Sequence, residues 1–126
     1  MTQDSQTMAT PQEVTNASLS NTLRALRDSF CAGLDERICR METAWANARA
    51  GHSSMSDALA VIEADAHRIS GIAGSLGLPD IGTQAYALEM RILKAPKDVL
   101  TAEDISQLDA EINSFLDRLE QELSDI

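Results

Sequence analysis

Apolar residues recur at a very regular spacing between Met55 and Leu76. Steps of four and three residues separate the members of this series: Met55, Leu59, Ile62, Ala66, Ile69, Ala73 and Leu76. These steps place the side chains on one face of an α-helix, and such a seam is typical of helices packed nearly parallel in a bundle. The segment is therefore predicted to be a helix that buries this face against other helices.

Three other segments have helical spacing too. The first covers residues 18–50, with Gly33 as a candidate position for a kink or a break. Another begins at Pro79 and ends before Ala95, and the last follows Thr101, an N-cap residue. Their apolar faces are formed by Leu19, Leu23, Leu26, Phe30, Leu34, Ile38, Met41 and Trp45; by Ile81, Ala85, Leu88 and Ile92; and by Leu108, Ile112, Phe115, Leu116, Leu119 and Leu123.

Only short connections separate the four segments. Gly51 ends the first, Ser53 or Ser54 caps the second, and Gly77 stops the second just before the third. Because short connections force neighbouring helices to run antiparallel, the predicted fold is all-α. It is an antiparallel up-down-up-down four-helix bundle with a long or kinked first helix.

The chain divides into a tail and one domain. Residues 1–17 are polar, contain Pro11 and have no apolar period, which predicts a flexible N-terminal tail. The remaining residues, 18–126, are expected to form one bundle, since 126 residues with 44% apolar content can bury a modest core.

Charge and composition exclude several classes of partner. The net charge is -10 and only four residues are aromatic, so no nucleic-acid partner is expected. No apolar stretch approaches the roughly 20 residues of a membrane span, and the N-terminus lacks the features of a secretory signal. We therefore expect a cytoplasmic protein that does not bind membranes.

Neither cysteine nor the first histidine suggests a metal site. Cys31 and Cys39 lie eight residues apart on one predicted helix, about 12 Å, which is too far for a disulfide. We expect both to be buried small hydrophobic residues, with a reactive or metal-binding role as the minor alternative. His52 follows Gly51 in a predicted loop and has no ligand partners at metal spacing.

His67, in contrast, is expected to point away from the bundle. At 100° per residue, the apolar seam of residues 55–76 centres about 130° away from it. A stripe of small residues shares the direction of His67 to within about 60°. Its members are Ala60, Ala64, Gly71 and Gly74.

Two glycines on one exposed helical face need a reason, because each costs about 0.5–1 kcal/mol relative to alanine. Close approach of another protein surface is such a reason, and a bare histidine that a partner can cover suits phosphoryl transfer between proteins. Two simpler explanations stay open on geometry alone: an exposed histidine with no special task, and a stripe where another helix docks.

The run AHRISGIAGSLG, residues 66–77, resembles the signature of histidine-containing phosphotransfer domains, roughly A-H-x-[LI]-K-G-x-A-x-x-[LF]-G. Leu88-Glu89 follows where such domains often carry an apolar-acidic pair, and residues 30–45 resemble their first bundle helices. The likeness covers about residues 19–93. One position departs from it, because Ser70 stands where the family usually has a lysine.

The resemblance implies that His67 is phosphorylated and that Gly71 gives an incoming receiver domain room. Ser70 would offer a hydroxyl hydrogen bond in place of the lysine charge. Glu89 is predicted to accept a hydrogen bond from the imidazole nitrogen that is not phosphorylated. Gly74 completes the expected surroundings of the phosphorylation site.

Three exposed residues, Ala60, Ala64 and Arg68, are assigned to the partner-binding surface around it. Arg68 projects about 100° around the helix from His67, so it is expected to meet a partner's acidic rim rather than the phosphate.

The function implied by the resemblance is a phosphoryl relay between receiver domains in a multistep two-component phosphorelay. The expected partners are response-regulator receiver domains and hybrid histidine kinases, with Mg²⁺ on the receiver and no cofactor or metal on this chain. A phosphocarrier rather than an enzyme is expected, and no nucleotide-binding signature suggests kinase activity from ATP.

The alternative is a helical adaptor that binds receivers or kinases without being phosphorylated, which Ser70 supports. A monomer is expected rather than a dimer, although an exposed apolar remainder on the first helix would support a dimer.

Overall fold

The computed structural model describes residues 11–96 and 99–124. Its elements, in order, are α1 (Pro11–Arg49), α2 (Met55–Ala73), the short 3-10 helix η1 (Gly74–Leu76), α3 (Pro79–Lys94) and α4 (Ala102–Ser124). The described residues contain helices and no strands, so the all-α prediction is confirmed. Within the same residues, no helix is both long and apolar enough to span a membrane.

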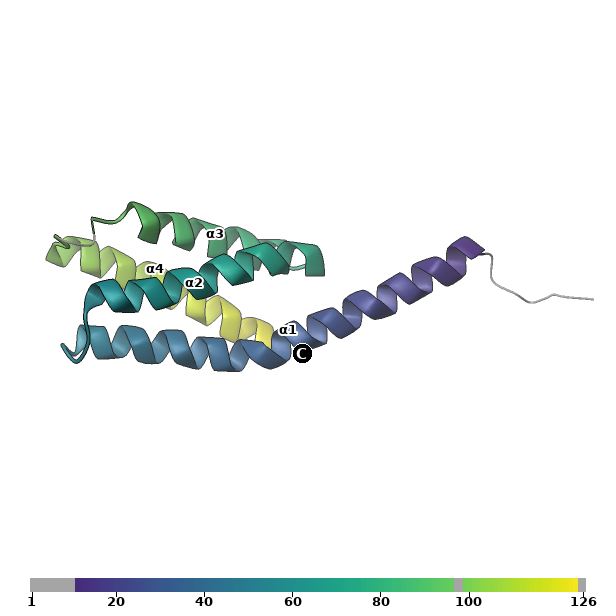
Figure 1. Ribbon diagram of the computed structural model, residues 1–126, viewed down its shortest axis with the longest axis horizontal. Coiled ribbons are helices and arrows are strands. Elements are labelled where there is room, and N and C mark those ends of the chain that lie inside the picture. The colour runs from purple at the N-terminus through teal and green to yellow at the C-terminus, as the bar shows by residue number, and fades with distance from the viewer. Residues whose placement is uncertain (1–10, 97–98, 125–126) are drawn as a thin grey trace, which may run out of the picture.

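The four helices surround one core, and each of them contacts two of the others. Helix α2 contacts α1 and α3, while α4 contacts α1 and α3, so within the described residues α2 and α4 lie diagonally opposite. Figure 1 shows the four helices side by side, with successive helices alternating in direction. One face of α2 therefore stays open between α1 and α3.

The core is built from the apolar faces that the sequence indicates. Side chains that are fully buried come from all four helices, and they belong to one continuous cluster. Large members of this cluster are Leu34, Met41, Leu59, Ile62, Ile69, Ile81, Ile92, Leu108, Ile112, Phe115 and Leu119. Burial of each such side chain contributes roughly 1.5–3 kcal/mol of hydrophobic stabilisation.

Helix α1 differs from the prediction in three ways. It begins at Pro11, seven residues before the predicted start, so residues 11–17 are helical where a flexible tail was expected. Proline is favoured in the first turn of a helix, where no N–H partner is needed. The remainder of the predicted tail, residues 1–10, lies outside the described residues. The helix is also not divided at Gly33, although Figure 1 shows it bending where it leaves the bundle.

The third difference concerns the apolar face of α1. Leu19, Leu23 and Leu26 are 57%, 41% and 52% exposed, so their predicted burial is wrong. The predicted face is buried only from Phe30 onward. Before Phe30, η1 contacts α1 through the Leu76 carbonyl, which accepts two hydrogen bonds from Arg27, and Figure 1 shows the first turns of α1 projecting beyond the bundle.

Helix ends follow the predicted capping residues. The Ser54 hydroxyl accepts a hydrogen bond from the Asp57 amide at 2.9 Å. Thr101 and Asp104 form a reciprocal capping box, with amide-to-side-chain distances of 3.0 and 3.1 Å. Gly51 and Gly77 both adopt positive φ, as expected for residues that end helices.

Polar contacts tie α1 to the other helices. Arg40 donates two hydrogen bonds to the buried Asp65 carboxylate, at 2.8 and 2.9 Å. The Trp45 indole N–H donates to Asp109 at 2.8 Å, and Arg49 pairs with the same carboxylate at 2.7 Å. The pKa of Asp109 lies below its ordinary value, mainly because of the hydrogen bond from Trp45 and to a smaller extent because of Arg49.

The two cysteines lie in different environments. Cys31 is buried, as predicted, and burial raises the pKa of its thiol. Cys39 is exposed, so its predicted burial is wrong. The helical spacing places it outside the sector of α1 that faces α2 and α4.

Candidate functional site

His67 lies on the open face of α2 with most of its side chain in solvent. The imidazole is 71% exposed, and its Nδ1 atom lies 2.6 Å from Oε2 of Glu89. Glu89 itself is buried on α3, with 8% of its side chain exposed. The predicted pair of His67 and Glu89 is therefore brought together by the packing of α2 on α3.

Close packing of these two helices determines where Glu89 lies. Gly82 on α3 is buried, and a Cβ there would lie 3.4 Å from the backbone nitrogen of Gly74 and 3.7 Å from the Ala73 Cβ. Because Gly82 and Glu89 are seven residues apart, they lie on the same face of α3. Distances of this size are ordinary van der Waals contacts, so Gly82 lies close to α2 on the face of α3 that also carries Glu89.

The hydrogen bond to Glu89 determines which nitrogen is available for chemistry. An ionised carboxylate only accepts hydrogen bonds, so the neutral imidazole donates its Nδ1–H to Glu89. Its Nε2 atom then carries the free lone pair. An imidazole that is 71% exposed and held in this tautomer can act as a nucleophile toward a group presented from outside the protein.

All members of the small-residue stripe are exposed beside His67. Ala60 and Ala64 precede it on α2, and Gly71 and Gly74 follow it. A Cβ built on Gly71 or Gly74 would meet no atom within 4 Å. Packing within the described part of the chain therefore does not require glycine at either position.

Two other predicted residues lie near His67 without contacting its ring by a hydrogen bond. The Ser70 hydroxyl donates to the backbone carbonyl of His67 at 2.9 Å. The expected hydrogen bond from Ser70 to the phosphate would require this bond to break. Arg68 is exposed, and within the described residues it forms no ion pair.

Glu63 is a member of the site that the sequence analysis missed. It lies one turn before His67 on α2, and one ligand atom from each of Glu63, His67 and Glu89 lies within 4.8 Å of the others. Two carboxylates and an imidazole are suitable ligands for a divalent transition metal. The spacing of four residues between Glu63 and His67 was the available signal, because it places both side chains on one helical face.

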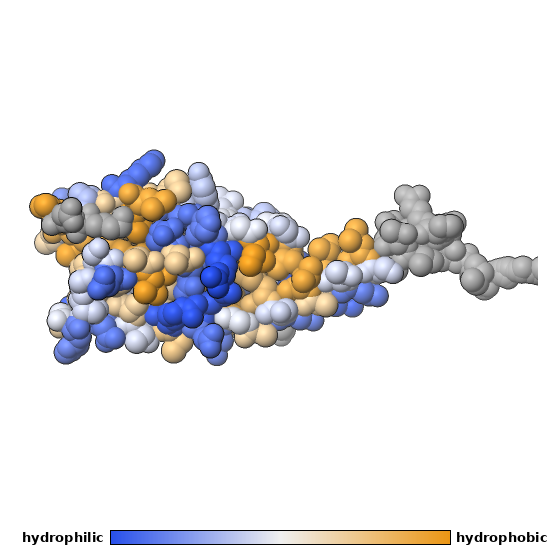
Figure 2. Space-filling model, viewed as in Figure 1, coloured by the Kyte–Doolittle hydropathy of each residue, from blue (hydrophilic) through white to orange (hydrophobic). Residues whose placement is uncertain are grey.

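Helices α1 and α3 form the two borders of the His67 face. On the α3 side, a shallow depression is lined by Ser70, Gly74, Pro79, Gly82, Thr83 and the exposed Tyr86. On the α1 side, a second depression includes Leu26, Arg37, Gly71 and Ile72. Figure 2 shows strongly hydrophilic residues across the middle of the molecule, followed by hydrophobic surface that continues along the projecting part of α1.

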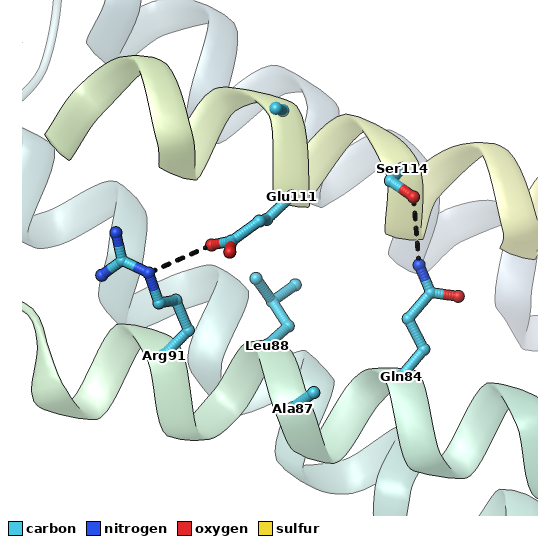
Figure 3. A pocket seen from close by; sticks show the side chains of 7 residues that line it. Gln84, Ala87, Leu88, Arg91, Glu111 and Ser114 are labelled. Carbon is cyan, nitrogen blue, oxygen red and sulfur yellow. Dashed lines mark hydrogen bonds and ion pairs between the residues drawn. The ribbon is translucent and has the colours of Figure 1, made fainter. Parts of the chain in front are cut away.

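A further hollow lies between α3 and α4, away from His67. It has a volume of about 270 Å³, and Leu88 and Ala87 lie on its α3 side (Figure 3). Arg91 pairs with Glu111 at 3.2 Å, and Gln84 contacts Ser114 at 3.3 Å across it. It contains none of the residues predicted to act in phosphotransfer, and its polar pairs join α3 to α4.

Comparison with known proteins assigns the chain to a family. Neither the curated proteins nor the solved structures yield a significant match to this sequence. The family model of the Hpt domain matches residues 25–125, which is most of the chain. The match contains the whole bundle, with His67 exposed on α2 and Glu89 behind it. The chain therefore belongs to the Hpt domain family, whose members carry phosphoryl groups in two-component signalling.

Proposed function

We propose that His67 accepts a phosphoryl group from the aspartyl phosphate of one receiver domain and passes it to the aspartate of another. The hydrogen bond between Nδ1 of His67 and the buried Glu89 is the observation that carries this proposal, because it leaves Nε2 free and exposed. The chain then acts as a phosphocarrier in a multistep phosphorelay.

The transfer step balances without another reactant. The Nε2 lone pair forms the N–P bond as the P–O bond to the aspartate breaks, and the receiver regains its carboxylate. The Nδ1 hydrogen stays with the ring, which becomes positively charged when Nε2 is substituted. Glu89, whose own side chain is buried, stabilises that charge at 2.6 Å.

The open face of α2 supports docking of a receiver domain. In-line attack requires the partner to bring its phosphorus within bonding reach of Nε2, so side chains beside His67 must be short. Ala60, Ala64, Gly71 and Gly74 meet this need. Arg68 is exposed next to them and suits the acidic rim of a partner's phosphorylation site.

The remaining chemistry belongs to the partner. Mg²⁺ belongs to the receiver, and this chain needs neither a cofactor nor ATP. Receiver domains of response regulators and of hybrid histidine kinases are the proposed partners, and the cytoplasm is the proposed location.

Transfer from a set of phosphorylated receiver domains tests the proposal. Wild-type chain should take up an acid-labile label from its donor, and the His67→Ala variant should take up none while still binding that donor. His52→Ala is the matched control and should be labelled like wild type, because His52 is exposed in the turn after α1. Binding without labelling by every donor would instead support the adaptor, the function that Ser70 in place of lysine favours.

A further inference from the structure

Three side chains that can bind a metal ion meet beside the nitrogen of His67 that phosphoryl transfer does not use. Nδ1 of His67 lies 2.6 Å from Oε2 of Glu89. Glu63 approaches the same imidazole, and one ligand atom from each of the three residues lies within 4.8 Å of the other two. Glu63 and His67 are one turn apart on α2, and Glu89 lies on α3, so the packing of these two helices assembles the group.

The two carboxylates have ligand atoms to spare. Glu89 has only 8% of its side chain exposed, and among the described residues its carboxylate accepts one side-chain hydrogen bond, through Oε2 from the imidazole. Glu63 is partly buried and forms no ion pair in the same part of the chain. Negative charge held away from water is costly unless a cation balances it. A divalent cation at the imidazole would balance both carboxylates.

The ligand set selects the class of ion. An imidazole nitrogen with two carboxylate oxygens suits Zn²⁺ and related transition metals, whereas Mg²⁺ prefers octahedral coordination by oxygen. Tetrahedral zinc bonds of about 2.0–2.2 Å place ligand atoms about 3.4 Å apart. Nδ1 and Oε2 would therefore separate by about 0.8 Å as Glu63 closes in. The imidazole, 71% exposed, has room for this rotation, and water would take the fourth position.

We propose that Glu63, His67 and Glu89 bind a divalent transition-metal ion such as Zn²⁺, and that the bound ion prevents His67 from accepting a phosphoryl group. The metal site stands on the geometry of the three side chains. Its effect on transfer rests on the function proposed above.

The ion acts through the proton of the imidazole. Without metal, Nδ1–H donates to Glu89 and Nε2 holds the lone pair. A metal ion on Nδ1 takes the lone pair of that atom, so the Nδ1 proton leaves to water and Nε2 takes up a proton from water. The ring keeps the same number of protons. Nε2–H, however, has no lone pair with which to attack phosphorus.

Calorimetric titration of the unphosphorylated chain with Zn²⁺ tests the site without a donor domain. Wild type should bind a single equivalent, and excess Mg²⁺ should not compete. Glu63→Gln should raise the Kd at least about tenfold, since even groups that only orient metal ligands are worth roughly 10–100-fold in affinity. Glu120→Gln is the matched control, because it makes the same change at an exposed carboxylate on α4, and it should bind like wild type. Equal Kd values for the two variants, or no binding by wild type, would overturn the site.

¹⁵N NMR of the imidazole tests the movement of the proton. The proton of neutral His67 should be on Nδ1 without metal and on Nε2 in the zinc-loaded chain. A proton that stays on Nδ1 when Zn²⁺ is bound would overturn Nδ1 as the ligand and the explanation of inhibition that depends on it.

Transfer assays test the inhibition. Each variant's rate with Zn²⁺ is divided by its own rate without Zn²⁺, because any effect of Zn²⁺ on the donor receiver is then common to all samples. At Zn²⁺ tenfold above the wild-type Kd, the site is about 90% occupied, so wild type and Glu120→Gln should slow about tenfold. Glu63→Gln should keep at least about half of its own rate.

Equal slowing of Glu63→Gln and Glu120→Gln would overturn the inhibition. A wild-type chain that takes up no label even without Zn²⁺ would contradict the proposed function and the inhibition together. The metal site would in that case still be decided by the titration.

Discussion

Replacement of Gly71 should separate the stability of α2 from its ability to transfer phosphoryl groups. A Cβ at this position would meet no atom within 4 Å, so alanine fits without any movement of the described residues. Alanine in a helix is more favourable than glycine by about 0.5–1 kcal/mol. For a domain of this size, that gain corresponds to a rise in Tm of about 2–5 °C.

A large side chain at the same position should have the opposite effect on function. The indole of Gly71→Trp would lie one turn from His67, on the face that a partner must cover. Displacement of the partner by about 1 Å is enough to cost roughly 100-fold in rate. We therefore expect Gly71→Trp to fold and to lose at least this factor in transfer, while Gly71→Ala keeps most of the wild-type rate.

Two assays on the same samples measure these effects. Circular dichroism during heating gives Tm, and rapid-quench transfer from a phosphorylated receiver domain gives the rate. Ser106→Trp is the control, because Ser106 is exposed on α4, diagonally opposite α2. Transfer by Gly71→Trp at the wild-type rate, or a lower Tm for Gly71→Ala, would contradict these expectations.

Three further substitutions test Glu89, Asp65 and Asp109, each of which is paired with a side chain on another helix. Glu89→Gln should retain part of the transfer rate, because its amide oxygen still accepts the Nδ1–H of His67. Glu89→Ala should transfer roughly tenfold more slowly than Glu89→Gln. Equal transfer rates in the two variants would mean that Glu89 takes no part in the mechanism. Asp65→Ala should lower the free energy of unfolding in urea by about 1–3 kcal/mol, because it leaves arginines on α1 without their partner; an unchanged midpoint would contradict this. The folded protein lowers the pKa of Asp109 below its value in the unfolded chain, which is near ~3.9. The ionised carboxylate therefore stabilises the fold at pH values above the unfolded pKa, and this stabilisation is lost as the pH falls through the folded pKa. Trp45 is the only tryptophan of the sequence, so its fluorescence can follow unfolding. Wild type should have a larger free energy of unfolding than Asp109→Asn at neutral pH, and this difference should shrink below about pH 4. A difference that stays constant with pH would contradict the role given to Asp109.

The spacing of apolar residues predicted the core side chains of α2, α3 and α4, because the face that each of these helices buries follows from its own sequence. The same spacing predicted the exposure of His67, since the direction of a side chain on a helix depends only on its position in the turn. Caps such as Ser54 and Thr101 were predictable for the same reason, because a cap acts within one turn of its own residue.

The features that the sequence analysis did not predict depend mostly on what lies opposite a residue. Leu19 continues the apolar seam of α1, but the sequence does not reveal that packing among the described residues leaves it 57% exposed. Asp65 occupies a buried position beside the seam, and its burial depends on Arg40, 25 residues earlier in the chain. The hydrogen bond of Ser70 to the His67 carbonyl is a local alternative that helical serines often adopt.

The nitrogen that carries phosphorus is the most direct test of the central claim. The chain is labelled with ¹⁵N, phosphorylated by its donor receiver, and examined by ¹⁵N and ³¹P NMR under alkaline conditions that preserve phosphohistidine. The hydrogen bond from Nδ1 to Glu89 predicts phosphorus on Nε2 of His67 and on no other residue. Phosphorus on Nδ1 of His67, or on His52, would contradict the account.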